Sequence, residues 1–386
     1  MELSKSSKIF GTIEIIAAVV IIITAVVFSP NLYTKPPKET VTVTEEQTVE
    51  NKEDGYLEVM GEENEEESLP PTIAETTAPT TIEQTNIGEY SVSGYIVVTK
   101  NSAMEMYSTN KAKLAEYTQT INTLSEKVPN TNVFMLLAPT RMEFYGPEEY
   151  KTGSHSQKSG IEFAYSSASP KVKCVDAYSE LSKKTNDYIY FRTDHHWTAR
   201  GAFCAYTEFC KSAGLSYAPL ESYQTGQLDG FVGSMYRYTG SEDLKNNPDY
   251  VEYFMPIFES SAQYFTSAAM TDPKPLRIIS TNITDPASKY LTFIQGDKPL
   301  IKMVSSSPRK EKVLLIKESY GNAFAPFLLE NFSEVYVLDP RQEGVRDMNL
   351  VQFINDNQIG SVICLNYTMA PSNATYMSAF KNIVNK

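Results

Sequence analysis

The sequence predicts an α/β fold in which a mostly parallel sheet is flanked by helices. From residue 90 onward, short continuous apolar runs alternate with segments that have the helical spacing of apolar residues. Continuous apolar runs are typical of strands buried on both faces, and their alternation with helices favours a parallel sheet. Residues 220–311 interrupt this rhythm, because they are rich in Tyr, Phe and Gly with little helical periodicity. We expect them to form a β- and loop-rich insertion packed on the sheet.

The chain begins with a short tail (residues 1–8) and a predicted transmembrane helix (9–29). Residues 9–28 are apolar apart from one glutamate and two threonines, and about 20 such residues are needed to cross a bilayer. A cleaved signal peptide is the alternative, but it prefers a shorter apolar core and a small-x-small cleavage site. The span is therefore interpreted as an uncleaved single-pass membrane anchor.

Residues 30–88 predict a disordered linker. Positions 34–88 carry 14 acidic side chains and three lysines, with many Thr and Pro residues and few large apolar ones. Such a segment buries too little surface to offset its ordering entropy. An acidic tether between an anchor and a folded domain (89–386) suggests work outside the cytoplasm. Without a concentrated basic surface, nucleic acid is excluded as a partner.

The expected elements of the folded part follow in chain order. Strands are predicted at 93–99, 132–139, 171–177, 187–191, 313–319, 334–340 and 361–367. Helices are predicted at 110–128 and 199–212, the second ending near Gly214. The four cysteines form no C-x-x-C pair and sit among apolar neighbours, so buried thiols are favoured over disulfides, although pairing stays open.

The stretch YFRTDHHWTARGAF (190–203) holds two of the three histidines of the chain. In an extended segment, Asp194 and His196 would share one face and His195 would point away. A carboxylate beside an imidazole can hold its tautomer and stabilise the protonated ring. Thr198 is expected to cap the helix that follows. Asp194 and His196 are therefore a candidate orienting acid and general base.

Ser319, in VLLIKESYGNAF, is the candidate nucleophile. It follows a buried strand and precedes a helix, and catalytic groups in open α/β sheets gather at the carboxyl ends of strands. Backbone N–H groups at a helix start favour a developing oxyanion. The alternatives are a structural role for the histidine cluster and a metal site, which the small number of ligands disfavours; no metal or cofactor is expected.

The motifs TDHHWT, KESYGNAFAPF and VYVLDPR resemble the DHHW family, which is similar to the alginate O-acetylation proteins of the SGNH hydrolase superfamily. APTRMEFYG, FVGSMY and FIQGDKP also look like family blocks, and the resemblance covers about residues 90–386. It implies an SGNH-hydrolase-like fold and a triad of Ser319, His196 and Asp194. The usual aspartate before the serine is Glu318 here, and Asp297 replaces a frequent asparagine.

The resemblance also bears on the oxyanion site, and the residues themselves offer candidates for substrate binding. If the family's asparagine donates to the oxyanion, Asp297 leaves that role in doubt, and the N–H groups of Ser319 and Gly296 are the fallback. Trp197 and Tyr236, with Tyr238, are candidates for stacking on sugar rings, with core packing as the alternative. Further candidate substrate-binding residues in the same motifs are Arg192, Tyr320 and Arg141.

The first functional hypothesis is a membrane-anchored extracytoplasmic O-acetyltransferase that modifies a cell-surface polysaccharide through an acyl-enzyme on Ser319. The family resemblance implies a membrane-bound acyltransferase partner that exports acetyl groups. The second hypothesis is a polysaccharide acetylesterase with the same triad, since only the acyl acceptor differs. The third is a non-catalytic glycan-binding scaffold of a cell-envelope complex. The spacing between Ser319 and His196 in the fold discriminates the scaffold from the other two.

Overall fold

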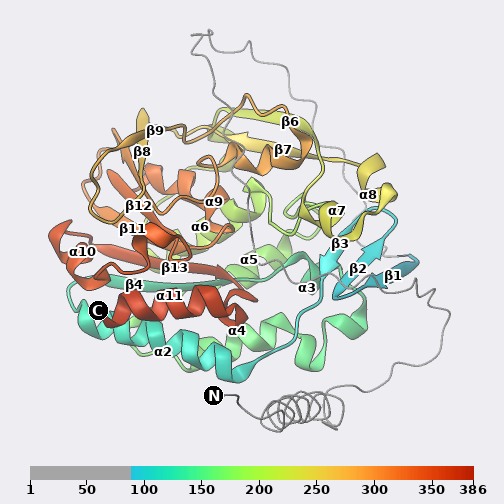
Figure 1. Cartoon of the computed structure of the whole chain (residues 1–386), viewed down its shortest axis with the longest axis horizontal. Helices are drawn as coiled ribbons and strands as arrows, with labels where there is room; N and C mark the ends of the chain where they lie inside the picture. Colours follow the sequence, from blue (N-terminus) through green and yellow to red (C-terminus); the bar gives the residue numbers. More distant parts are fainter. Residues whose placement is uncertain (1–87) are drawn as a thin grey trace, which may run out of the picture. The chain divides into compact units, whose positions relative to one another are not determined.

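A computed structural model describes residues 88–386 (Figure 1). The predicted tail, the predicted anchor and all but the last residue of the predicted linker lie outside the described residues. Across residues 88–386, no helix combines the length and the apolar character that crossing a membrane requires.

An eight-stranded sheet forms the centre of the described part, in the order β5-β4-β13-β11-β12-β10-β8-β9. The five strands from β5 to β12 run parallel, and β10, β8 and β9 continue the sheet antiparallel. The sheet is thus mostly parallel with an antiparallel edge. Its strands are β4 (Asn132–Ala138), β5 (Val172–Cys174), β8 (Ser260–Phe265), β9 (Lys274–Leu276), β10 (Leu300–Ser305), β11 (Lys312–Lys317), β12 (Glu334–Leu338) and β13 (Ser361–Tyr367).

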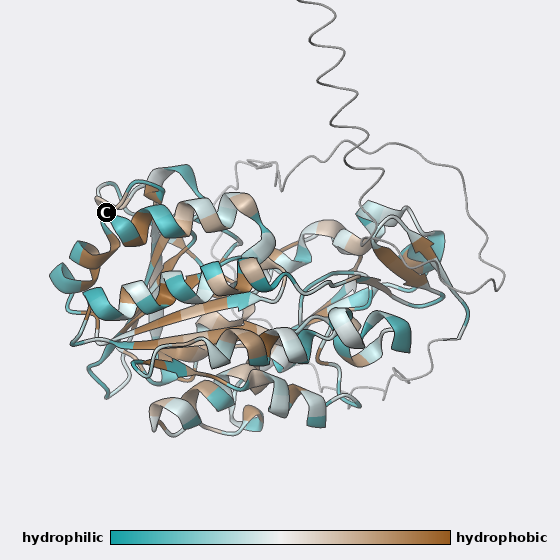
Figure 2. Cartoon of the chain, turned by 90° about the horizontal axis from the view of Figure 1, so that it is seen from below, coloured by the Kyte–Doolittle hydropathy of each residue, from teal (hydrophilic) through white to brown (hydrophobic). Residues whose placement is uncertain are grey.

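Helices cover both faces of this sheet, as the continuous apolar runs predicted. Along β4, Phe134 and Leu136 join one hydrophobic cluster while Val133 and Met135 join the other, because successive side chains point to opposite faces. Figure 2 shows the resulting apolar strands lying between helices of mixed character. One face is covered by α2 (Lys111–Lys127), α4 (Gln157–Ser166), α10 (Leu350–Asp356) and α11 (Ala374–Asn385), and the other by α5 (Ala177–Lys183), α6 (Ala199–Ala213) and α9 (Gly321–Phe324).

The local signals at the helix ends agree with the structure. The Thr198 hydroxyl accepts a hydrogen bond from the Gly201 N–H at 3.3 Å and so caps α6. Gly214 ends that helix with a φ of 71°, a left-handed conformation that favours glycine. Helix α2 likewise begins at an Asn110 cap whose side chain accepts from the Lys113 N–H.

Two predicted strands lie outside the main sheet. The run 93–99 splits into a hairpin, and its strands join a small antiparallel sheet of β1 (Tyr90–Ser93), β2 (Ile96–Thr99) and β3 (Ala103–Glu105). The run 187–191 makes only an isolated bridge between Tyr190 and Trp197. Its aromatic side chains are buried by the core instead, which gives the same apolar pattern without strand pairing.

The insertion is more than a layer on the sheet, and that expectation is corrected. Its strands β8, β9 and β10 extend the main sheet, while β6 (Thr225–Phe231) and β7 (Asp249–Phe254) form a separate two-stranded sheet. Strand β8 is partly exposed and carries polar residues, so it lacks the continuous apolar run of the central strands. Two short helices, α7 (Ser234–Thr239) and α8 (Glu242–Asn246), connect β6 to β7.

All four cysteines lie within the described residues and are unpaired. Cys204, Cys210 and Cys364 are buried, and Cys174 is partly buried. Burial raises the pKa of the Cys210 thiol to about 12, so it stays protonated near neutral pH. The interpretation as buried thiols is confirmed.

Candidate active site

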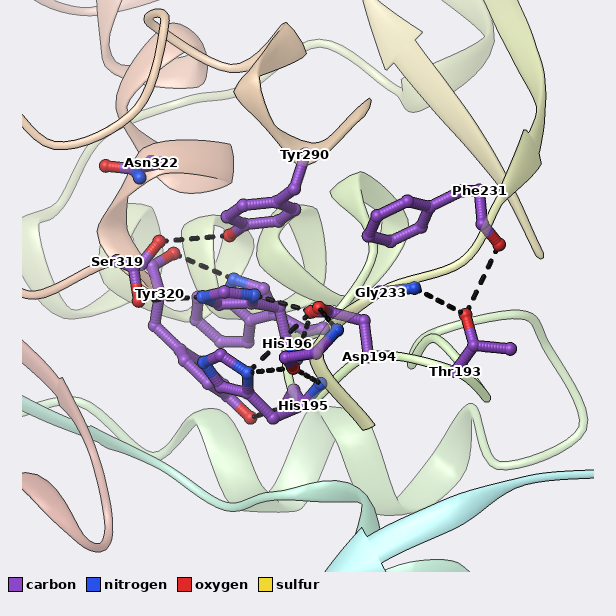
Figure 3. Close-up of polar contacts among 12 residues, drawn as sticks. Thr193, Asp194, His195, His196, Phe231, Gly233, Tyr290, Ser319, Tyr320 and Asn322 are labelled. Carbon is purple, nitrogen blue, oxygen red and sulfur yellow. Dashed lines mark hydrogen bonds and ion pairs between the residues drawn. The ribbon is translucent and has the colours of Figure 1, made fainter. Parts of the chain in front are cut away.

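The fold brings together the three side chains that the sequence nominated (Figure 3). The Nε2 atom of His196 lies 2.7 Å from Oγ of Ser319, and the Nδ1 atom of the same ring lies 2.6 Å from Oδ1 of Asp194. Ser319 lies between β11 and α9, and the other two residues lie in the loop before α6. The expected distances are therefore observed, whereas catalysis by these residues stays a prediction.

The loop that carries Asp194 and His196 is bent rather than extended. Oδ1 of Asp194 also accepts the His196 N–H at 3.0 Å, which folds the chain back on itself. As a result, the His195 ring does not point away. Its centroid lies 3.8 Å from that of His196, although His195 does not face Ser319. The alternation expected for an extended segment was wrong here.

A buried carboxylate from the insertion fixes this loop. Asp249, on β7, accepts hydrogen bonds from the N–H groups of Arg192 and Thr193 at 2.9 and 2.7 Å. It also accepts the Thr193 hydroxyl at 2.8 Å and the Arg192 Nε–H at 3.0 Å. Backbone donors held by one buried acceptor leave the loop little freedom. The insertion therefore helps to set the position of Asp194 and His196.

Asp194 is held in its ionised form. Burial opposes ionisation, but the charge of His196 and the hydrogen bonds from His196 and the Ser234 N–H hold the pKa of Asp194 below its usual range. The Ser234 N–H donates to Oδ2 at 2.8 Å. The preceding residue, Gly233, lies so close that an added Cβ would be 2.3 Å from the Cβ of Asp194. Only glycine fits there without a shift of the carboxylate.

His196 is completely buried, and an aromatic ring from the insertion stacks on it. Tyr290, in a short 3-10 helix (Pro286–Thr292), has its ring centroid 3.8 Å from that of His196 at an interplanar angle of 9°. The Tyr290 hydroxyl donates to the carbonyl oxygen of Ser319 at 3.0 Å. Tyr290 thus contacts both the candidate base and the backbone of the candidate nucleophile.

Ser319 is nearly buried, with 7% of its surface exposed, rather than lying in an open cleft. Its neighbour Glu318 is also buried and accepts the N–H groups of Tyr320 and Tyr367, each at 3.0 Å. Burial raises the pKa of the Glu318 carboxyl, against the effects of the Arg341 charge and these two N–H groups. Glu318, which stands where the family usually has aspartate, therefore supports the turn between β11 and α9 through its carboxylate.

Two residues considered for the oxyanion site, Gly296 as a fallback donor and Asp297 with its role in doubt, have other partners. The Gly296 N–H donates to the carbonyl oxygen of Phe293 at 3.1 Å. Asp297 is an ionised acceptor: despite burial, the charges of Lys317 and Arg341 hold its pKa below the usual range. An ionised carboxylate has no hydrogen to donate. Of the donors nominated from the sequence, the Ser319 N–H stays a prediction.

Asp297 belongs to a buried ionic network beside the nucleophile. Its Oδ1 lies 2.6 Å from Nζ of Lys317 and accepts the side-chain N–H of Asn322 at 2.9 Å, and its Oδ2 pairs with Arg341 at 2.5 Å. Asp339 completes the network, 3.6 Å from Lys317 and 2.7 Å from Arg341. The sequence left the oxyanion role of Asp297 in doubt, and the structure places this carboxylate in an ionic network.

Two aromatic residues expected to bind substrate are core residues. Trp197 and Tyr320 are both fully buried. The Trp197 Nε1–H donates to the Tyr320 carbonyl oxygen at 2.9 Å, and the Tyr320 hydroxyl donates to the His195 carbonyl oxygen at 2.5 Å. Their polar atoms are satisfied inside the protein, so they position the histidine loop instead of stacking on a ligand.

The two arginines have partners inside the protein, and sugar stacking by Tyr236 and Tyr238 stays a prediction. Arg192 pairs with buried Asp249, and Arg141 is buried with its guanidinium 4.5 Å from the Tyr145 ring centroid. Tyr236 packs on a small apolar cluster that includes Met235 and Leu244. Tyr238 is 45% exposed and lies beside Arg237.

The histidine cluster contains residue types that bind metals, but its side chains make hydrogen bonds to one another and to Ser234. Ligand atoms of Asp194, His195 and His196 lie within 4.8 Å of one another. The facing atoms of Asp194 and His196 already share a short hydrogen bond, and the Nδ1 atom of His195 lies 2.6 Å from the Ser234 hydroxyl. These contacts occupy Nδ1 of both histidines and Oδ1 of Asp194.

Sequence reasoning missed the residues that the insertion contributes to the candidate active site. Gly233, Ser234, Asp249 and Tyr290 all come from it and all contact the histidine loop or Ser319. Gly233 and Ser234 lie in FVGSMY, which was noticed only as a family block. No local signal distinguishes Tyr290 from the many other tyrosines of the chain.

The geometry suits nucleophilic chemistry. The Ser319 hydroxyl can pass its proton to Nε2 of His196, while Asp194 holds the other nitrogen and offsets the charge that forms. Both acceptor oxygens of Asp194 are occupied by N–H donors, so its orientation is fixed. The arrangement can support attack on an acyl carbonyl.

Comparisons with known proteins agree on the relationship of the chain. Residues 42–338 match the model of the family described as DHHW protein. The crystal structure of a DHHW family protein from Eubacterium siraeum is similar with a TM-score of 0.69 and 30% identity, over 76% of this chain and 97% of that one.

More distant similarities involve named proteins. Bacillus cereus PatB1 carrying a sulfonyl adduct has a TM-score of 0.60 and 18% identity, over 73% of this chain and 97% of that chain. The O-acetyltransferase domain of Pseudomonas putida AlgJ has a TM-score of 0.39 and 13% identity, over 70% of this chain and 89% of that domain. A search of the curated proteins gave no match. On the family match and the 30% identity, this chain belongs to the DHHW family.

Proposed function

We propose that this protein is an O-acetyltransferase that forms an acetyl-enzyme on Ser319 and passes the acetyl group to a hydroxyl of a cell-surface polysaccharide. The observation that supports it most is the continuous chain from Ser319 Oγ through His196 to Asp194, with contacts of 2.7 and 2.6 Å. Such a chain activates a serine that is otherwise a weak nucleophile. The acetyl group and the polysaccharide acceptor rest on the resemblance of the motifs to acetylation proteins.

The reaction has two half-reactions. Oγ of Ser319 attacks the carbonyl carbon of an acetyl donor, its proton moves to Nε2 of His196, and the departing alcohol or thiol takes that proton. A hydroxyl of the acceptor then attacks the acetyl-serine, His196 accepts its proton, and Ser319 is regenerated as it takes the proton back. The N–H of Ser319 would stabilise each tetrahedral oxyanion.

The same proposal has three further parts. They are attachment to a membrane through residues 9–28, an extracytoplasmic location, and a membrane-bound acyltransferase as the partner that donates acetyl groups. The composition of the N-terminal segment supports the first two. The family resemblance supports the third.

The test is turnover of 4-nitrophenyl acetate by the full-length chain, with and without added oligosaccharides. We expect Ser319→Ala to fold and to lose about 10³-fold or more in kcat, as for loss of a triad serine. Ser166→Ala, an exposed serine on α4, is the matched control and should behave as wild type. Phenylmethylsulfonyl fluoride should add one sulfonyl group to wild type and none to Ser319→Ala.

The alternatives give different results. An acetylesterase would release acetate at the same rate with or without oligosaccharide and leave the sugar unmodified. A metal-dependent enzyme would lose activity with a chelator and keep it in Ser319→Ala. A wild-type protein that neither hydrolyses the ester nor reacts with the sulfonyl fluoride would refute the covalent mechanism and leave a glycan-binding scaffold as the explanation.

A further inference from the structure

The His196 ring is enclosed between two other rings. Tyr290 lies against it at a centroid distance of 3.8 Å, and His195 also lies at 3.8 Å with an interplanar angle of 36°. His196 itself has no exposed surface, whereas the His195 side chain is 18% exposed. His195 is thus the member of this stack that meets solvent.

His195 is held in this position from three directions. Its Nδ1 atom lies 2.6 Å from Oγ of Ser234, and its backbone N–H donates to the same oxygen at 3.3 Å. Its carbonyl oxygen accepts the Tyr320 hydroxyl. Because the Ser234 N–H also donates to Asp194, one serine of the insertion fixes both the carboxylate and the outer histidine.

We propose that His195 is a positioning residue whose ring closes the outer face of His196 and keeps that ring in the plane joining Ser319 to Asp194. The inference rests on the proposed function. It explains why two histidines stand side by side in the sequence: the second contacts the nucleophile and the first covers the second. The nitrogen atoms of His195 serve to anchor its ring to Ser234 and transfer no proton.

Charge supports this division of roles. Burial lowers the pKa of His195, and the charge of His196 lowers it further, while Asp194, Glu105 and Glu318 act in the opposite direction. His195 therefore stays neutral when His196 is protonated, which avoids two like charges in contact.

The remaining groups around His195 do not change this conclusion. Asp194 Oδ1 lies 4.0 Å from its Nδ1, and Glu105 on β3 and Glu318 beside Ser319 act on it through their charges. The rings of Tyr320 and Tyr367 lie 6.3 and 6.5 Å away by centroid. Burial raises the pKa of Tyr320 well above its ordinary value, so it remains uncharged.

The test separates the ring from its nitrogen atoms in the full-length chain. His195→Phe keeps a ring over His196 and removes the contact with Ser234, His195→Asn keeps a polar atom near Nδ1 and removes the ring, and His195→Ala removes both. The measurements are kcat and KM for 4-nitrophenyl acetate from pH 5 to 9, with thermal unfolding of each variant.

We expect His195→Phe to retain kcat within about tenfold of wild type, and His195→Asn and His195→Ala to lose about 10²-fold, the order of loss that misplacement of a catalytic group produces. The loss in the Asn and Ala variants should fall on kcat over the whole range from pH 5 to 9, because the His196 ring is then no longer held in line between Asp194 and Ser319. The KM values should change less than kcat.

Each other outcome overturns the inference. If His195→Phe loses as much activity as His195→Ala, a nitrogen of His195 takes part in the chemistry. If all three variants lose stability but keep the kcat and KM of wild type, the role of His195 is structural alone. A wild-type protein without any esterase activity would remove the proposed function itself, a result distinct from either of these.

Discussion

The Nε2 atom of His196 lies 2.7 Å from Oγ of Ser319, although 123 residues separate the two in the chain. The contact exists because β11 ends at the same region of the fold as the loop before α6. Each residue is then fixed by groups outside its own motif: Ser319 by the Tyr290 hydroxyl and His196 by the stacked Tyr290 ring.

Tyr290 should matter more through its ring than through its hydroxyl. Tyr290→Phe keeps the ring and loses one hydrogen bond to the Ser319 carbonyl, so kcat/KM should fall by about two- to tenfold, as expected for a bond worth about 0.5–1.5 kcal/mol. Tyr290→Ala also uncovers His196 and should cost about 10²-fold. Ester hydrolysis measures both.

A matched control for Tyr290 is Tyr217→Ala, since Tyr217 is 37% exposed and lies outside the histidine stack. Its activity should equal that of wild type. Equal activities of Tyr290→Ala and Tyr217→Ala would show that the stack has no effect on turnover.

Gly233→Ala should displace Asp194. The new Cβ would lie 2.3 Å from the Asp194 Cβ and 2.4 Å from its Oδ2, and forced overpacking costs about 1–3 kcal/mol. We expect lower thermal stability and at least about tenfold lower kcat, because the carboxylate no longer aligns with His196. Gly360→Ala is the control, since its nearest contact would be an ordinary 3.8 Å. Normal kinetics in Gly233→Ala would mean that the backbone relaxes without moving the carboxylate.

Acid should remove the contribution of Asp194 to stability. Its pKa in the folded protein is held below the usual range, so its contribution is fully present above the unfolded value of about 3.9 and is lost as pH falls toward the folded value. Urea unfolding of wild type and Asp194→Asn between pH 7 and pH 3 measures this. The stability difference between them should shrink below about pH 4. A difference independent of pH would contradict the assignment of an ionised, hydrogen-bonded Asp194.

Asp297→Ala should destabilise the fold rather than act through the oxyanion. It leaves Lys317, whose side chain is completely buried, with only Asp339 at 3.6 Å. Breaking a buried ion pair from one side typically costs about 3–5 kcal/mol. Chemical unfolding measures the loss, and the control is Glu242→Ala, which removes the exposed pair with Lys245 and should leave stability unchanged. A normally stable Asp297→Ala would show that Asp339 and Arg341 rearrange to hold the lysine.

The sequence by itself determined the alternation of strands and helices and the two chain segments that carry the candidate triad. Buried strands such as β4 and β11 show as continuous apolar runs, and the Thr198 cap and Gly214 mark the ends of α6. These signals are readable because strand burial and helix capping depend on residues close together in the chain. The same local information placed Ser319 after a strand and His196 before a helix.

Only the tertiary structure decided what surrounds those residues. Tyr290 and Ser234 come from an insertion whose packing no local pattern specifies, and the bent loop turns His195 onto His196 instead of away from it. Trp197 was a candidate for sugar stacking with core packing as the alternative, and the fold buries it completely. Asp297 became an ion-pair partner only because the fold places Lys317 and Arg341 beside it. The physical reason is that contacts between distant segments depend on how all elements pack together, whereas periodicity and capping record only each segment's own environment.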